Sequence, residues 1–158
     1  MDYIAQLIER YPVLASVENE IRTAYQVLER AYTNHKKLLV GGNGGSCADA
    51  EHIVGELMKG FVKKREIPKT MQERLLGLDQ ELGKQLANGL QSSLRAIAIT
   101  GHAGLSTAFA NDVDPEMTYA QQVNGYGDEG DVLLAISTSG NSKNLIYAAL
   151  TARAKDMP

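Results

Sequence analysis

The sequence has 158 residues, of which 44% are apolar and 22% are charged, and its net charge is −3. This composition is typical of a soluble globular protein, and the length predicts a single domain over residues 1–158. No apolar run approaches the ~20 residues of a membrane helix, and no extended basic surface suggests a nucleic acid as ligand. With one cysteine and no secretory signal at its start, the chain is expected to be cytoplasmic.

The first 35 residues predict two amphipathic helices. Apolar side chains recur at helical spacing over residues 4–13 and 17–32, and Ser16 is placed to cap the second helix. The apolar positions of the second helix lie on one stripe, which consists of Val17, Ile21, Ala24, Tyr25, Leu28, Ala31 and Tyr32. A single thin sheet does not fully cover such a stripe, which favours contacts between subunits.

Three short apolar runs predict strands at residues 37–40, 96–100 and 131–137. The last two are apolar throughout, which is typical of strands buried on both faces of a parallel sheet. Helical patterns follow at residues 48–62 and 143–154, and residues 69–93 predict an extra helix or helical hairpin. The sequence therefore predicts a doubly wound, three-layer α/β sandwich with a mostly parallel sheet, whose ligands bind beyond the carboxyl ends of the strands.

The segment after the third predicted strand carries the strongest signal for a bound anion. Four of the six residues 137–142 have hydroxyl side chains, and Gly140 and Asn141 permit backbone turns at the start of a helix. Free backbone N–H groups and the helix dipole favour an anion there. A helix cap needs only one hydroxyl, so we favour a phosphate site over a simple cap. The hydroxyls of this site are those of Ser137, Thr138, Ser139 and Ser142.

A glycine-rich loop, residues 42–46, follows the first predicted strand in the same way. It does not match a Walker loop, because no Gly-Lys-Ser/Thr follows, and it lacks the acidic partner of a dinucleotide fingerprint. A tight turn explains Gly44 and Gly45. Because such a turn has less need of Asn43 and Ser46, we favour close approach of this loop to a ligand. Two such loops at one edge predict a site that holds opposite ends of one small phosphorylated molecule.

His52 and Glu56 are four residues apart on the predicted helix after the glycine-rich loop, so they face the same way. Such a pair can bind one divalent metal ion or act as an acid–base couple. Spacing alone somewhat favours a solvated surface pair, but the nearby loop supports a functional role. Asp49 and Glu51 lie on other faces of this helix and are expected to be ordinary surface acids.

Further polar residues follow the second predicted strand. Asp112 is placed to orient a sugar hydroxyl or a ligating histidine, and a helix-ending Asn-Asp turn explains it equally well. His102 either lines the same edge of the sheet or is merely exposed.

Together these segments resemble the sugar isomerase (SIS) family, most closely its phosphoheptose isomerases. The resemblance rests on residues 42–46, 48–56, 110–112 and 130–142, and it covers most of the chain from Leu38 onward. It implies an SIS-type fold and a homotetrameric cytoplasmic enzyme. The implied reaction converts sedoheptulose 7-phosphate to D-glycero-D-manno-heptose 7-phosphate. Residues 1–35 match the helices that form the core of the family's tetramer.

The resemblance also implies a role for each matching residue. The hydroxyl loop binds the phosphate, and the sugar site is lined by Asn43, Ser46 and Asp112, with the backbone of Gly44 and Gly45 close by. His52 and Glu56 are catalytic and zinc-binding residues, and Glu56 is the acid/base that moves a proton between C1 and C2 through an enediol. The family's glutamine ligand and second catalytic histidine, together with later strands and a helix, would lie beyond Pro158.

Two differences among family members bear on the expected function. Residues 69–93 are additional to its compact members. A non-catalytic branch binds a replication initiator protein and acts as a regulator or assembly factor, and it lacks the acid that matches Glu56. We therefore expect an isomerase, with a non-catalytic phosphosugar-binding SIS module as the alternative.

Overall fold

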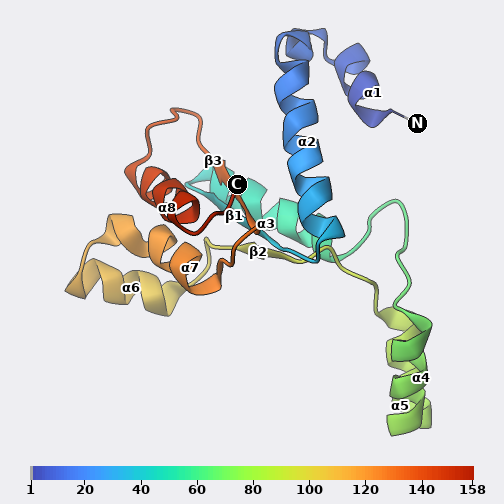
Figure 1. The fold of residues 1–158 in the computed structure, drawn as a ribbon. Coiled ribbons are helices and arrows are strands. Elements are labelled where there is room, and N and C mark those ends of the chain that lie inside the picture. Colours follow the sequence, from blue (N-terminus) through green and yellow to red (C-terminus); the bar gives the residue numbers. More distant parts are fainter. Residues whose placement is uncertain (1) are drawn as a thin grey trace.

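A three-stranded parallel sheet forms the centre of the molecule (Figure 1). The computed structural model describes residues 2–158. The strands are β1 (Leu38–Gly42), β2 (Ala96–Ala98) and β3 (Val132–Ile136), in the spatial order β2-β1-β3. Both neighbours of β1 run parallel to it, so all three strands end at the same edge of the sheet. The predicted α/β class with a parallel sheet is confirmed.

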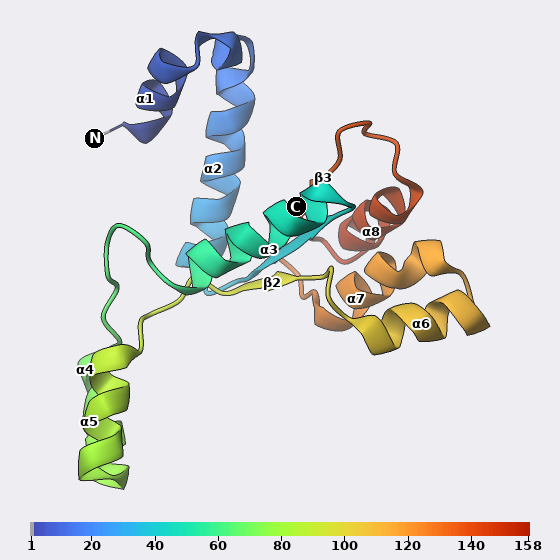
Figure 2. The same ribbon diagram turned by 180° about the vertical axis from the view of Figure 1, so that it is seen from behind.

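Helices cover both faces of this sheet (Figure 1, Figure 2). On one face lie α2 (Glu18–Thr33) and α3 (Gly45–Met58), and on the other lie α7 (Thr118–Tyr126) and α8 (Lys143–Ala154). Next to α7 stand α6 (Ala103–Asp112) and the short 3-10 helix η2 (Pro115–Met117). The bounds of α8 are those predicted, whereas α3 begins and ends earlier than residues 48–62. Helices α6 and α7 were not predicted from the sequence.

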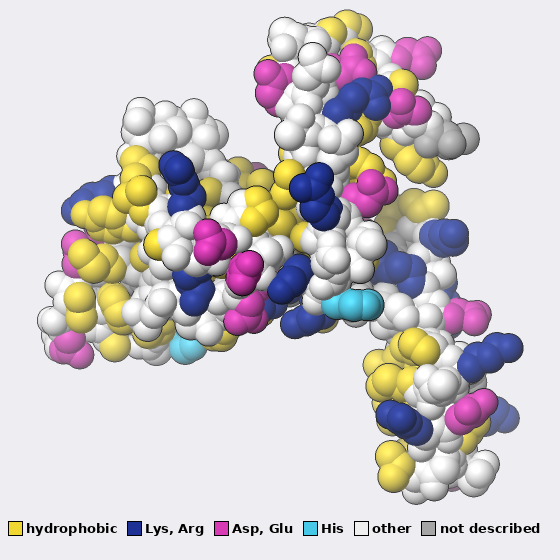
Figure 3. Space-filling model, viewed as in Figure 1, with side chains coloured by type: hydrophobic (Ala, Val, Ile, Leu, Met, Phe, Trp, Pro, Cys, Tyr) yellow, Lys and Arg dark blue, Asp and Glu magenta, His cyan; other side chains and the backbone are white. Residues whose placement is uncertain are grey.

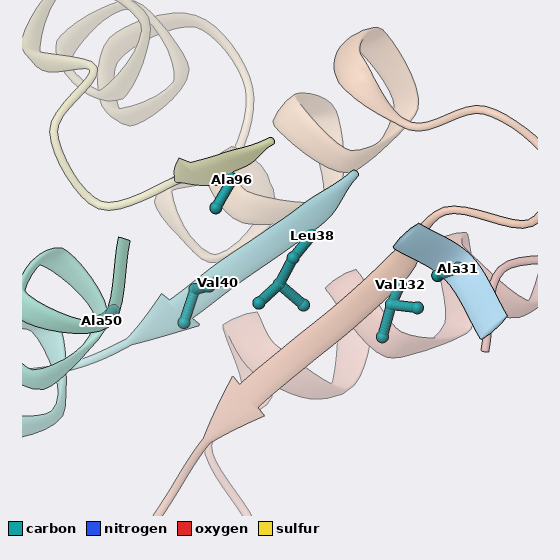
Figure 4. Packing of buried hydrophobic residues seen from close by; sticks show 6 residues of the cluster. All are labelled: Ala31, Leu38, Val40, Ala50, Ala96 and Val132. Carbon is teal, nitrogen blue, oxygen red and sulfur yellow. The ribbon is translucent and has the colours of Figure 1, made fainter. Parts of the chain in front are cut away.

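The strands alternate their side chains between two hydrophobic cores, because successive residues point to opposite faces. Leu38 and Val40 of β1 face α2 and α3. They pack there with Ala31, Ala50, Ala96 and Val132 (Figure 4). Leu39 faces the other way, toward α7 and α8, and packs with Val123, Ala148 and Ala152. All three β1 side chains are at most 1% exposed, so β1 is the buried centre of the fold.

The outer strands differ from the prediction in two respects. β2 ends at Ala98, and β3 is one residue shorter at each end than residues 131–137. Leu134 and Ala135 are exposed, although the third strand was expected to be buried on both faces. β3 lies at one edge of the described sheet, where the covering helices leave part of its surface open.

The N-terminal helices form an arm that extends away from the sheet (Figure 1). The arm consists of α1 (Tyr3–Arg10), the 3-10 helix η1 (Pro12–Val17) and α2. The prediction that Ser16 caps α2 is wrong, because Ser16 lies inside η1 and Val17 stands at the cap position without a side-chain cap bond. At the sheet end of α2, Ala31 is buried, whereas Val17 and Tyr25 of the predicted stripe are exposed.

A second projection is the hairpin of α4 (Lys69–Leu78) and α5 (Gln80–Gly89), which agrees with the helical prediction for residues 69–93. The two helices pack against each other, and Asp79 caps α5 by accepting the backbone N–H groups of Glu81 and Leu82. Large apolar side chains stay exposed along it (Figure 3), among them Met71, Leu78, Leu82 and Leu86. No helix within residues 2–158 combines the length and apolar character needed to cross a membrane.

A buried ion pair joins the amino ends of β1 and β3. The Lys37 ammonium contacts the Asp131 carboxylate, which also accepts the backbone N–H groups of Lys37 at 2.9 Å and Asp128 at 2.8 Å. Lys37 also pairs with Asp128, whose side chain is 77% exposed. Burial alone raises the pKa of the Asp131 carboxyl, but its hydrogen bonds from Lys37 and Asp128 outweigh burial and hold that pKa below 3.8.

This pair stands at the start of the β1–β3 ladder. One residue further along, Leu38 lies opposite Val132, and at the far end Gly42 lies opposite Ile136. The loops that follow β1 and β3 therefore leave the sheet at the same level.

We expect Asp131→Ala to lower the free energy of unfolding by about 3 kcal/mol, because it leaves a buried ammonium with one exposed partner. The Asp131 carboxylate contributes to the free energy of unfolding at neutral pH. This contribution is lost as the pH falls below 3.8 and passes through the lower pKa that Asp131 has in the folded chain. Stability of the variant should therefore depend less on pH in this acidic range. Urea unfolding across neutral and acidic pH measures both effects.

Asp128→Ala is the matched control for Asp131→Ala, since it removes the exposed partner of the same lysine. It should cost less than about 1 kcal/mol. Equal losses in the two variants would contradict the importance assigned to the buried carboxylate.

Candidate active site

The serine-rich loop, residues 137–142, leads from β3 into α8 and is held in shape by its own hydroxyls. Ser137 Oγ accepts the backbone N–H of Gly140 at 3.1 Å and lies 3.2 Å from Ser142 Oγ. Ser139 Oγ accepts the backbone N–H of Asn141 at 3.2 Å. Gly140 has a φ of 67°, in the left-handed region that glycine adopts without strain. The loop is therefore organised before any ligand binds.

The same loop leaves donors free at the start of α8. Within residues 2–158, the backbone N–H groups of Thr138, Ser139 and Ser142 meet no protein acceptor. Ser142 stands at the N-cap position, but its side chain accepts no cap bond. Free N–H groups at a helix start attract an anion, and the helix dipole adds to this attraction. This arrangement suits the predicted phosphate site better than a simple helix cap.

The glycine-rich loop, residues 42–46, begins at the end of β1. Gly44 has φ 56° and ψ −120°, a conformation that residues with a Cβ atom rarely adopt. Helix α3 starts at Gly45, inside the predicted loop, and Ser46 is half-buried in its first turn. The side chains of Asn43 and Asn144 exchange two hydrogen bonds, which ties this loop to α8. The structure thus brings the two predicted loops together.

Helix α7 supplies two side chains that the sequence analysis missed. The Tyr119 hydroxyl donates to the Gly42 carbonyl at 2.7 Å, and Gln122 Nε2 donates to the Ile99 carbonyl at 2.8 Å. Gly42 is the last residue of β1 and Ile99 directly follows β2, so both bonds anchor α7 at the carboxyl ends of strands. Burial raises the pKa of Tyr119, so its hydroxyl stays protonated and remains a donor. Their spacing of three residues could have identified them, had the helix been predicted.

His52 and Glu56 lie on α3 as predicted, with His52 Nε2 3.7 Å from Glu56 Oε1. Their side chains are 79% and 49% exposed, respectively. Both line an open groove of about 600 Å³, whose other lining residues are Asp49, Ile53, Leu57 and Ile136. Ile136 directly precedes Ser137, so the groove reaches the end of β3 from which the serine-rich loop departs, although no residue of that loop lines it.

Two other acids of α3 have more specific positions than the prediction gave them. Asp49 and Glu51 are exposed, as expected of surface acids. Asp49 nevertheless lines the groove with His52 and Glu56, so the prediction that it lies on another face of the helix is wrong. Glu51 Oε1 accepts a hydrogen bond from Thr100 Oγ1 at 3.1 Å. Glu51 therefore ties α3 to the segment that follows β2.

The predicted residues after β2 are less integrated with the loops. Asp112 is the last residue of α6 and accepts a hydrogen bond from Asn111 Nδ2 at 2.6 Å, which matches the alternative of a helix-ending turn. No hydrogen bond or ion pair within residues 2–158 joins Asp112 to either loop. His102 is exposed and caps α6, where Nδ1 accepts the backbone N–H of Leu105 at 3.3 Å. A sugar contact of Asp112 stays a prediction.

Comparisons with known proteins place the chain in a family. A family model described as the SIS domain matches residues 87–158. The phosphoheptose isomerase of Aromatoleum aromaticum is 33% identical, over 99% of this chain and 70% of that protein. The chain belongs to the phosphoheptose isomerase family. The chain is also 35% identical to a phosphoheptose isomerase from a Nitratiruptor species. That match covers 90% of this chain and 65% of the relative.

Solved structures agree with this assignment. A phosphoheptose isomerase from Neisseria gonorrhoeae matches with a TM-score of 0.64 and 30% identity, over 98% of this family member and 64% of that chain. A phosphoheptose isomerase from Francisella tularensis matches with a TM-score of 0.66 and 26% identity, over 99% of this chain and 73% of that chain. The predicted SIS-type fold is confirmed.

Proposed function

We propose that this protein is an aldose–ketose isomerase that converts sedoheptulose 7-phosphate to D-glycero-D-manno-heptose 7-phosphate. The observation that carries the proposal is the groove that connects the His52–Glu56 pair with Ile136, beside the serine-rich loop. A sugar phosphate in this groove can reach the anion site at one end and a carboxylate base at the other. The relatives that bear the name phosphoheptose isomerase support the same reaction.

The serine-rich loop binds the phosphate in this proposal. Its free N–H groups and the hydroxyls of Ser137, Thr138, Ser139 and Ser142 donate to the phosphate oxygens. Because the phosphate takes no part in the bond changes, its binding energy serves to position the sugar. The sugar end lies against Asn43, Ser46 and the backbone of Gly44 and Gly45, with Asp112 as a further hydroxyl-orienting group.

Glu56 moves the proton between the reacting carbons. It removes a proton from C1 of the ketose while the oxygen on C2 gains one, which gives an enediol. Return of a proton to C2, with loss of the hydroxyl proton on C1, gives the aldose. His52 lies 3.7 Å from Glu56, close enough to orient this carboxylate and to share in the transfer between the two oxygens.

His52 and Glu56 are also the residues that would hold zinc. Their facing atoms, 3.7 Å apart, fit two positions of one coordination sphere. Residues 2–158 contain no cluster of three or more His, Cys, Asp and Glu side chains suited to a metal, so the remaining ligands would be water or groups outside this set. A zinc ion bound there would polarise the substrate carbonyl.

The assembly proposed is a cytoplasmic homotetramer. In it, residues 1–158 form one domain, residues 1–35 supply the oligomerisation helices and residues 69–93 are an insertion. Exposed apolar side chains on the N-terminal arm support this proposal, namely those of Tyr3, Tyr11, Val13, Val17 and Tyr25. Exposed apolar surface of this kind is typical of contacts between proteins. Sedimentation equilibrium should give the mass of four chains, and a monomeric mass would contradict the proposal.

We expect purified protein to form the aldose from sedoheptulose 7-phosphate, and Glu56→Gln to lower kcat by roughly 10²- to 10⁴-fold, since that is the usual contribution of a general base. Binding of inorganic phosphate should persist in this variant, because the serine-rich loop is unchanged. A product assay by NMR, with and without zinc, measures turnover, and calorimetry measures phosphate binding.

Glu73→Gln, an exposed glutamate on α4, is the matched control and should retain full activity. Failure of the wild-type protein to form the aldose with any divalent metal would remove the isomerase proposal and leave a phosphosugar-binding module. An unchanged kcat in Glu56→Gln would remove this residue from the role of base.

A further inference from the structure

We propose that Asn144 is a positioning residue that holds the Asn43 side chain in the orientation that binds the sugar. This inference rests on the proposed function and deepens it. Asn144 lies in the first turn of α8, just after the serine-rich loop, whereas Asn43 lies in the glycine-rich loop after β1. The two residues are 101 positions apart in the sequence.

The two carboxamides form a reciprocal pair. Asn43 Nδ2 donates to Asn144 Oδ1 at 3.0 Å, and Asn144 Nδ2 donates to Asn43 Oδ1 at 2.8 Å. Two simultaneous bonds fix both the separation and the plane of the Asn43 amide, which a single bond would leave free to rotate. The pair therefore links the sugar end of the proposed site to the helix that begins at its phosphate end.

A third hydrogen bond fixes the polarity of the pair. The backbone N–H of Leu145 donates to Asn144 Oδ1 at 2.9 Å. This N–H, which also donates to the Ser142 carbonyl at 3.0 Å, favours the amide oxygen at that position, so Asn144 Nδ2 is the atom opposite Asn43 Oδ1. Asn144 Oδ1 in turn lies opposite Asn43 Nδ2, so the backbone at the start of α8 sets which way round both amides lie.

The pair leaves one hydrogen-bond donor of Asn43 available to a ligand. Its Oδ1 and one hydrogen of Nδ2 are used in the pair, so one N–H remains to donate to a ligand. An oxygen that gains negative charge as the enediol forms is a suitable acceptor, and a donor fixed in advance stabilises such charge more than a mobile one. Phosphate bound at the start of α8 would hold this helix, and through Asn144 it would hold the donor.

The test is a double-mutant cycle on the whole chain with Asn43→Ala, Asn144→Ala and both together. We expect Asn144→Ala to lower kcat about tenfold and to weaken substrate binding by a smaller factor, and Asn43→Ala to lower kcat further, toward the ~10²-fold loss typical of one such donor. The double variant should be no slower than Asn43→Ala, because Asn144 acts only through Asn43. The proposal would be overturned if the loss of kcat in the double variant equalled the product of the two single losses. An unchanged kcat in Asn144→Ala would overturn it as well.

Two further variants guard against simple unfolding. Asn144→Leu keeps the same number and branching of side-chain heavy atoms while removing both bonds to Asn43, and it should reproduce the kcat loss of Asn144→Ala. Asn124→Ala, at an exposed position of α7, should keep wild-type kcat. Thermal unfolding of each variant shows whether it is folded, and a kcat loss that follows thermal stability across the set would contradict a positioning role.

Calorimetry separates this proposal from the proposed reaction. If the wild-type protein binds sedoheptulose 7-phosphate without turnover, the isomerase proposal fails but the cycle can still be measured as Kd. Both single variants should then weaken binding of the sugar phosphate while leaving inorganic phosphate unaffected, and the double variant should bind no more weakly than Asn43→Ala. Equal Kd values for sedoheptulose 7-phosphate in the wild type and both single variants would overturn the role of Asn144.

Discussion

The register between β1 and β3 is the constraint on which the candidate site depends. The buried Lys37–Asp131 pair holds the amino ends of the two strands together, and the ladder then places Gly42 opposite Ile136. A shift of one residue would turn the side chains of a strand to the opposite face and put the loops at different levels. The Asn43–Asn144 pair closes the carboxyl end of the same ladder, so polar contacts stand at both ends of the β1–β3 pair.

Much of the fold could be predicted because β1, β3 and α8 have continuous or periodic apolar patterns with glycine and serine between them. Helix α7 lacks such a pattern, since its buried positions include the polar residues Thr118 and Gln122. Their hydrogen-bonding groups bind the backbone, as Gln122 does at Ile99, and this compensates for burial without leaving an apolar stripe in the sequence. Ser16 has the residue type of a cap, but a 3-10 helix through Val17 displaces the start of α2.

The candidate site was predictable in its residue types and not in its partners. Hydroxyls, glycines and the four-residue spacing of His52 and Glu56 are local features, so the sequence shows them directly. Asn144 and Tyr119 act on residues that are 101 and 77 positions away, and only the folded chain brings those pairs together. The groove between α3 and Ile136 likewise exists only once β3 lies beside β1, and it brings the exposed His–Glu pair to the end of β3.

We propose that one sugar phosphate spans this edge of the sheet, from the serine-rich loop to Glu56. A crystal structure of Glu56→Gln with sedoheptulose 7-phosphate tests it most directly, because the slowed variant retains the substrate. We expect phosphate oxygens within hydrogen-bond distance of Ser137 and Ser142, with C1 and C2 beside the side chain at position 56. A phosphate bound elsewhere, or a sugar chain directed away from α3, would contradict it.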